Sequence, residues 1–80
     1  MKIKLVAYGI AREILGNSTL DISLGENSRI KELKNRLVAD YLAFGNLVSL
    51  RFAVNEEYQT DDFQLSENDE VVIIPPVSGG

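Results

Sequence analysis

The residues best suited to chemistry in this chain are its last six, Pro-Pro-Val-Ser-Gly-Gly at positions 75–80, which follow an apolar segment at 71–74. Because proline lacks an N–H and has a fixed φ, Pro75 and Pro76 stop a strand and favour a stiff, extended tail that reaches roughly 20 Å. Gly79 and Gly80 have no side chains, so their backbone fits a narrow channel. We therefore expect the tail to deliver the terminal carboxylate of Gly80 to another protein. The alternative is a flexible end that happens to contain glycine.

The composition excludes several other kinds of chemistry. The chain has 80 residues, with no cysteine and no histidine. Without cysteine it cannot form a disulfide, a thiolate nucleophile or a zinc–thiolate site. Without histidine it lacks the commonest general base and metal ligand, so we expect no metal site and few options for a catalytic site. The net charge of −4, with no basic cluster, argues against nucleic-acid binding.

The length and hydropathy indicate one small soluble domain. Hydrophobic residues make up 45% and charged residues 25% of the chain, which is ordinary for a globular protein. No apolar signal core precedes the first strand-like segment, and no apolar run is long enough to span a membrane. We therefore expect a cytoplasmic protein with no membrane partner.

The alternation of apolar and polar residues predicts two strands at 2–8 and 18–24. The first strand would bury Ile3, Leu5 and Ala7 on one side. Since only a short connection separates the two strands, they should form an antiparallel hairpin. We expect the connection at 9–17 to contain at most a short helical turn.

A change to helical spacing predicts a helix of about fourteen residues, long enough to cross one face of a small sheet. Ser28 is the expected N-cap. Lys31 stands where the glutamate of a capping box would be, so that box should be absent. The predicted buried face of the helix consists of Ile30, Leu33, Leu37, Val38, Tyr41 and Leu42.

Further strands are expected at 47–54, briefly around 58–60, and at 70–74, with Phe63 or Leu65 of the intervening loop in the core. The first and last strands should be the central parallel pair, with the helix in the connection between them. This order predicts an α+β fold of the ubiquitin-like β-grasp type, a mixed sheet of four to five strands with one main helix on one face. The domain would span 1–74 and the tail 75–80.

The strand alternation also leaves the sheet face opposite the helix uncovered. Aliphatic and tyrosine side chains on such a face form a good docking surface, although scattered apolar residues are common on any monomer. The residues predicted on this face are Val6, Tyr8, Arg51, Ala53, Val72 and Ile74.

With the tail and this order of elements, the chain resembles the small subunits of molybdopterin synthase, the MoaD-like sulfur carriers of the MoaD/ThiS family. The most specific piece is Asp-Glu-Val at 69–71 followed by the apolar strand and the tail. Supporting pieces are Ala-Arg-Glu at 11–13, Gly16, and Ala-Val-Asn at 53–55. Asn68 stands where the family often has glycine, and asparagine tolerates the same left-handed conformation.

The resemblance implies a cycle in which partners act on the tail. An ATP-dependent, MoeB-like activating enzyme would adenylate the carboxylate of Gly80, and a sulfur donor protein would convert it to a thiocarboxylate. The tail would then enter a MoaE-like large synthase subunit and give its sulfur to a cyclic pyranopterin, forming the molybdopterin dithiolene. The chain would be no enzyme on its own but the sulfur-donating subunit of a two-subunit sulfurtransferase. It would bind no cofactor, because ATP is used by the activating enzyme and sulfur is carried covalently.

The resemblance also implies roles for individual residues. Gly80 carries the chemistry, and the residues that give it access are Pro75, Pro76, Val77, Ser78 and Gly79. The expected partner interface comprises Tyr8, Arg12, Arg51, Tyr58, Val72 and Ile74. Arg12 is otherwise a solvated charge, and Tyr58 is otherwise an edge of the core.

Three alternative functions share much of this pattern. A ThiS-like carrier for thiamine thiazole synthesis has the same fold, double glycine and thiocarboxylate. A ubiquitin-like modifier would join Gly80 to lysines of target proteins. A β-grasp binding module with an inert tail would be indifferent to the addition or deletion of one residue at Gly80.

Overall fold

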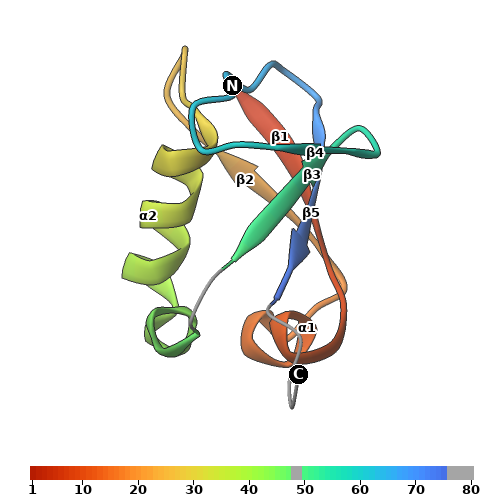
Figure 1. The fold of residues 1–80 in the computed structure, drawn as a ribbon, viewed down its shortest axis with the longest axis vertical. Helices are drawn as coiled ribbons and strands as arrows, with labels where there is room; N and C mark the ends of the chain where they lie inside the picture. Colours follow the sequence, from red (N-terminus) through yellow and green to blue (C-terminus); the bar gives the residue numbers. More distant parts are fainter. Residues whose placement is uncertain (48–49, 76–80) are drawn as a thin grey trace.

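The computed structural model describes residues 1–47 and 50–75 of the chain, which form one mixed sheet with a helix across one face (Figure 1). The elements in chain order are β1 (Lys2–Ala7), α1 (Gly9–Leu15), β2 (Thr19–Ser23), α2 (Ile30–Asp40), the 3-10 helix η1 (Leu42–Asn46), β3 (Arg51–Val54), β4 (Glu57–Gln59) and β5 (Glu70–Ile74). The strand order in the sheet is β2-β1-β5-β3-β4. This is the predicted β-grasp arrangement.

The first and last strands form the centre of the sheet, as the sequence predicts. β1 and β5 are parallel, with Val6 and Val72 as Cα partners. β1 also pairs antiparallel with β2, and β5 pairs antiparallel with β3. Because β5 has a hydrogen-bonded neighbour on each side, the segment that leads into the tail is held by the middle of the sheet.

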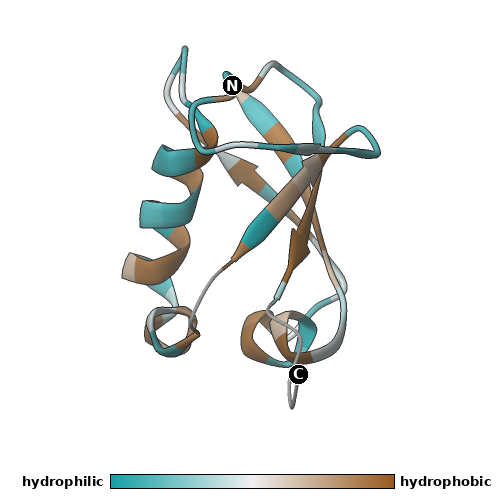
Figure 2. Cartoon of the chain, viewed as in Figure 1, coloured by the Kyte–Doolittle hydropathy of each residue, from teal (hydrophilic) through white to brown (hydrophobic). Residues whose placement is uncertain are grey.

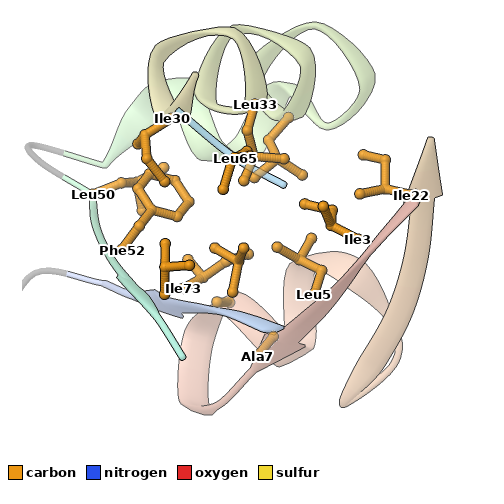
Figure 3. Close-up of a cluster of buried hydrophobic side chains, with 14 of the residues drawn as sticks. Ile3, Leu5, Ala7, Ile22, Ile30, Leu33, Leu50, Phe52, Leu65 and Ile73 are labelled. Carbon is orange, nitrogen blue, oxygen red and sulfur yellow. The ribbon is translucent and has the colours of Figure 1, made fainter. Parts of the chain in front are cut away.

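The core lies between the sheet and α2, where side chains from both layers point toward one another (Figure 3). The predicted inward positions of β1 are confirmed, since Ile3, Leu5 and Ala7 are buried. α2 contributes Ile30 and Leu33 from the other side. In Figure 2, α2 changes between hydrophilic and hydrophobic around its turns, and the end of β5 is hydrophobic. The other buried members include Leu37, Phe44, Leu50, Phe52, Val54, Leu65, Val71 and Ile73.

The connection between β1 and β2 contains more helix than the sequence predicted. α1 has seven residues, and its buried side chains, Ala11 and Leu15, are four positions apart and therefore lie on one face. Gly9 has a φ of 54°, which turns the chain from β1 into the helix. Gly16 has a φ of 80° and its N–H donates to the carbonyl of Arg12 at 2.8 Å, which ends the helix.

α2 begins one residue later than predicted, because its N-cap is Arg29 and not Ser28. Arg29 is the N-cap residue, and its N–H donates to Glu32 Oε1 at 2.7 Å, which is one half of a capping box. The hydroxyl of Ser28 instead donates to the carbonyl of Gly25 at 2.7 Å. With Ser28 as the N-cap, the position of the capping-box glutamate would be Lys31. With Arg29 as the N-cap, that position is Glu32, so the predicted absence of the box was wrong because the cap was misplaced by one residue.

The C-terminal end of the predicted helix is also different in the structure. α2 ends at Asp40, and Tyr41 is extended with a φ of −132° before η1 begins. As a result, Leu42 is 80% exposed, although the helical spacing predicted it on the buried face. Phe44 takes its place in the core, with its ring edge-on to Tyr41 at a centroid distance of 6.1 Å.

β3 is shorter than the strand predicted at 47–54, because it begins at Arg51 and Val48 and Ser49 lie outside the described residues. The turn into β4 has Asn55 and Glu56 at φ values of 49° and 77°. Positive φ at both central residues is the geometry that suits a tight hairpin. Asn68, before β5, has a φ of 68°, so the asparagine adopts the left-handed conformation expected of it.

Candidate functional site

The described part of the site is the point at which β5 ends and the tail starts. Pro75 follows β5 directly and is the last described residue. The other predicted tail residues, Pro76, Val77, Ser78, Gly79 and Gly80, lie outside the described residues. β5 therefore defines where the tail leaves the domain, at the end of the molecule that also holds α1 (Figure 1).

Asn55 fixes the other end of β5 to the β3–β4 turn. Its Nδ2 donates to Asp69 Oδ1 at 3.0 Å, and its Oδ1 accepts from the backbone N–H of Glu70 at 3.0 Å. The backbone N–H of Asn55 also donates to the carbonyl of Glu70 at 2.9 Å. Asp69 Oδ2 in turn accepts from the N–H of Ser66 at 2.8 Å. These bonds hold the register of β5 and so determine the position at which the tail begins.

One row of residues crosses the uncovered sheet face from edge to edge. Val72 is the Cα partner of both Val6 and Ala53, and the row continues to the edge strands on each side. Its members, in strand order, are Thr19, Val6, Val72, Ala53 and Tyr58. The sequence predicted the three central members together. It did not predict that Thr19 is aligned with Val6, because the partner of a strand residue is set by the register of the hairpin and not by the residue itself.

A second row, nearer the tail, joins Ile74 to Arg51, which are Cα partners. Tyr8 follows Ala7, whose partner is Ile73, and so continues β1 beside the end of β5. We call Val6, Tyr8, Arg51, Ala53, Tyr58, Val72 and Ile74 the docking face. It contains the six positions predicted from the strand alternation, together with Tyr58.

The tyrosines provide most of the exposed aromatic surface of the docking face. Tyr8 is 63% exposed and Tyr58 is 70% exposed, whereas Val72 and Ile74 are half-buried. Val6 and Ala53 are only 9% exposed, so they contribute less surface than the alternation predicted. The centre of the face is therefore small and aliphatic, with a large amphipathic ring on either side.

Sequence reasoning missed Ile10, which is also exposed near the tail. Ile10 belongs to α1, and its neighbour Ala11 lies on the buried face of that helix. Because the sequence predicted at most a short helical turn at 9–17, it gave no basis for saying which residues of this connection are buried and which are exposed. The signal was the spacing of Ala11 and Leu15, which marks the inner face of a short helix and leaves Ile10 outside.

Two exposed arginines lie on elements of the domain that Figure 1 shows at the tail end, α1 and the start of β3. Arg51 is on the docking face beside Ile74. Arg12 is on α1, where its backbone N–H donates to the carbonyl of Tyr8 at 3.3 Å. Within the described part of the chain, neither guanidinium has a carboxylate within 4.0 Å. Their positive charges are therefore available to a partner.

Two kinds of feature are absent from the described residues: a cluster of metal-ligating side chains and a long apolar helix. Across residues 1–47 and 50–75, no group of three or more acidic side chains is placed to hold a metal ion. No helix among those residues is both long enough and apolar enough to cross a bilayer.

Comparison with known proteins assigns the family. The ThiS family model matches residues 6–80. The chain is 36% identical to the molybdopterin synthase sulfur carrier subunit of Arabidopsis thaliana, over 100% of this chain and 84% of that one. It is 34% identical to the protein of the same name from Chlamydomonas reinhardtii, with 100% of both chains covered. Its fold matches a putative molybdopterin converting factor subunit 1 from Pyrococcus furiosus with a TM-score of 0.88 and 26% identity, over 96% of this chain and 99% of that one. The chain is thus a ubiquitin-like β-grasp protein that belongs to the ThiS family of sulfur carriers.

Proposed function

We propose that this chain is the sulfur carrier subunit of a molybdopterin synthase. The observation that carries the proposal is the match to molybdopterin synthase sulfur carrier subunits over the whole chain, combined with a family match that continues through residue 80 and so includes Gly79 and Gly80. The fold supports it, because the central strand β5 leads directly into the tail.

The chemistry is carried by the carboxyl group of Gly80. A carboxylate is a poor electrophile, so an activating enzyme first joins it to AMP with release of pyrophosphate from ATP. Sulfur that a sulfur donor protein delivers at the oxidation level of sulfide then displaces AMP, and the product is a thiocarboxylate with a soft, nucleophilic sulfur. Inserted into the large synthase subunit, the thiocarboxylate sulfur attacks a cyclic pyranopterin, and water then cleaves the acyl–sulfur bond, so that Gly80 returns to a carboxylate. Two charged chains supply the two sulfurs of one dithiolene. The chain binds no cofactor itself in this cycle, which takes place in the cytoplasm.

The docking face is the surface by which the activating enzyme and the large subunit hold the domain. Its aliphatic centre, Val72 and Ile74, is flanked by Tyr8 and Tyr58, and aromatic residues are enriched at protein interfaces. Arg51 and Arg12 add positive charge beside the tail. The narrow tail residues, Pro75 to Gly80, then extend from this surface into the partner. The pair of subunits forms the sulfurtransferase, and its other catalytic groups are those of the large subunit.

Reconstitution tests the proposal. The chain is treated with ATP, an activating enzyme and a sulfur donor protein, and is then mixed with a large synthase subunit and cyclic pyranopterin. We expect the dithiolene product to form, and a chain truncated after Gly79 to give none. A charged chain that forms no dithiolene but supports thiazole synthesis would contradict the proposal and establish the thiamine alternative. Conjugates between Gly80 and lysines of other proteins in a cell extract would instead establish the modifier.

A further inference from the structure

We propose that the outer edge of β2 is a self-complementary surface that would pair with a second copy of this chain, and that Arg36 and Asp21 keep this edge unpaired. The pairing involves residues of the domain alone, whatever group Gly80 carries. The sheet ends on β2 and β4, so each of these strands has one side without a strand neighbour (Figure 1). An unpaired strand edge accepts a strand of another chain unless the protein blocks it.

β2 is the longer of the two edges, with five residues against three in β4. Its bonds to β1 show which of its backbone groups point outward. The N–H of Leu24 donates to the carbonyl of Met1 at 2.8 Å, and the N–H of Ala7 donates to the carbonyl of Ser18 at 2.9 Å. Because bonded and non-bonded pairs alternate in an antiparallel ladder, the even-numbered residues of β2 bond to β1 and the odd-numbered residues direct their N–H and C=O outward. The residues with outward backbone groups are Thr19, Asp21 and Ser23.

These outward groups are self-complementary about Asp21. If two β2 strands paired antiparallel about a two-fold axis, Asp21 would lie opposite the same residue of the second copy, and Thr19 would lie opposite Ser23. Each outward N–H would then face a carbonyl of the other copy. The backbone of β2 is therefore able to join two sheets into one.

Arg36 of α2 occupies one of the groups that this pairing needs. Its Nη1 donates to the carbonyl of Ser23 at 3.1 Å, and its Nε donates to Asp40 Oδ2 at 2.8 Å. Asp40 is four positions farther along the same helix, so the guanidinium is held between the two acceptors. A strand that approached Ser23 would have to displace this side chain.

Asp21 opposes the pairing by its charge. Its Cα partner on β1 is Lys4, whose Nζ lies 4.0 Å from Glu70 Oε2. Within residues 1–47 and 50–75, no cation lies within 4.0 Å of the exposed carboxylate of Asp21 itself. In the symmetric pair two such carboxylates would face each other from adjacent strands, and like charges placed directly opposite are unfavourable.

The test replaces both blocking residues in the full-length chain. Asp21→Thr exchanges the charge for a β-branched side chain that favours a strand, and Arg36→Ala frees the carbonyl of Ser23 at little cost to the helix. Asp62→Thr with Lys31→Ala is the matched control, because both residues are exposed and Lys31 is on the same helix. Each double variant loses one acid and one base, so the net charge stays at −4. Sedimentation equilibrium measures the dimer dissociation constant, and amide hydrogen exchange reports which strand residues become paired.

We expect the dimer dissociation constant of the Asp21→Thr/Arg36→Ala chain to be at least tenfold lower than that of the wild type or of the control. The amides at positions 21 and 23 should exchange more slowly in this dimer, because they then donate to the second copy. The amides of Leu20 and Ile22, which bond to β1, should be protected in every folded chain. Asp21→Thr alone leaves Arg36 in place and should lower the dissociation constant by a smaller factor.

Equal dissociation constants in the double variant and its control would overturn the proposal. A dimer in which the amides at positions 21 and 23 still exchange rapidly would also overturn it, because the association would lie elsewhere on the molecule. So would a wild-type dimer with those amides protected, since Arg36 and Asp21 would then not keep the edge unpaired. If lost protection at Leu20 and Ile22 shows that the double variant is unfolded, Asp21→Thr alone decides, and an unchanged dissociation constant there contradicts the proposal.

Discussion

At the scale of single residues, Asn55 has the most consequential side-chain contacts in the described structure. It accepts from Glu70, donates to Asp69, and has a φ of 49° at the start of a tight turn. Asn55 belongs to the Ala-Val-Asn segment that supports the family resemblance, and the sequence predicted a turn there. It did not predict the contact with Asp69, fourteen positions away, because that contact depends on the register between β3 and β5.

Substitution of Asn55 tests this contact. Asn55→Ala loses two hydrogen bonds and retains the unfavourable φ, so we expect it to lower the free energy of unfolding by about 2–3 kcal/mol. Asn55→Gly loses the same bonds but tolerates the φ, and should cost about 1 kcal/mol less. Urea unfolding of the two variants and wild type measures both values. Equal losses in the two variants would show that the backbone conformation contributes nothing.

At the scale of elements, long alternating segments were predicted well and short helices poorly. β5 was predicted with its observed bounds, and the inward side of β1 was correct at Ile3, Leu5 and Ala7. The length of α1 was not predicted, because a helix of two turns repeats its spacing only once, at Ala11 and Leu15. Nothing in the spacing of apolar residues revealed that the chain unwinds at Tyr41, which exchanges Leu42 for Phe44 in the core.

The end of α1 gives a prediction at this scale. Gly16→Ala meets no atom within 4 Å, so its cost arises from the φ of 80° alone. We expect a loss of about 1 kcal/mol in the free energy of unfolding. Gly25→Ala is the control, since Gly25 has no positive φ and its nearest neighbour would be Ser28 Oγ at 3.9 Å. A loss at Gly16 no larger than at Gly25 would contradict the role of Gly16 as a left-handed helix terminator.

The docking face gives a second prediction for the elements that form it. Replacing Tyr8 and Tyr58 by alanine removes the two most exposed rings of the face without changing the core. If these rings are interface anchors worth about 2 kcal/mol each, the double variant should bind the large synthase subunit roughly a thousandfold more weakly. Leu42→Ala is the control, because Leu42, on η1, is even more exposed than the two tyrosines and does not belong to the docking face. Titration calorimetry with the large subunit distinguishes the two, and equal affinities would remove the tyrosines from the interface.

At the scale of the whole molecule, the fold buries its hydrophobic core between the sheet and α2 and places the start of the tail at one end of the sheet. The sheet and α2 enclose the hydrophobic residues, and β5 passes through the centre of the sheet toward the tail. The sequence predicted this plan because the parallel pairing of the first and last strands follows from the order of the elements. It could not predict which residues lie side by side across the strands, because that depends on the register of each strand pair.

The measurement that tests the central claim most directly is the intact mass of the protein purified from its own host, with fragmentation of the C-terminal peptide. We expect a fraction of the chains to carry sulfur in place of one oxygen, located on Gly80, and this fraction to rise after incubation with ATP, an activating enzyme and a sulfur donor. A terminus that remains an unmodified carboxylate under all these conditions would contradict the assignment of this chain as a sulfur carrier.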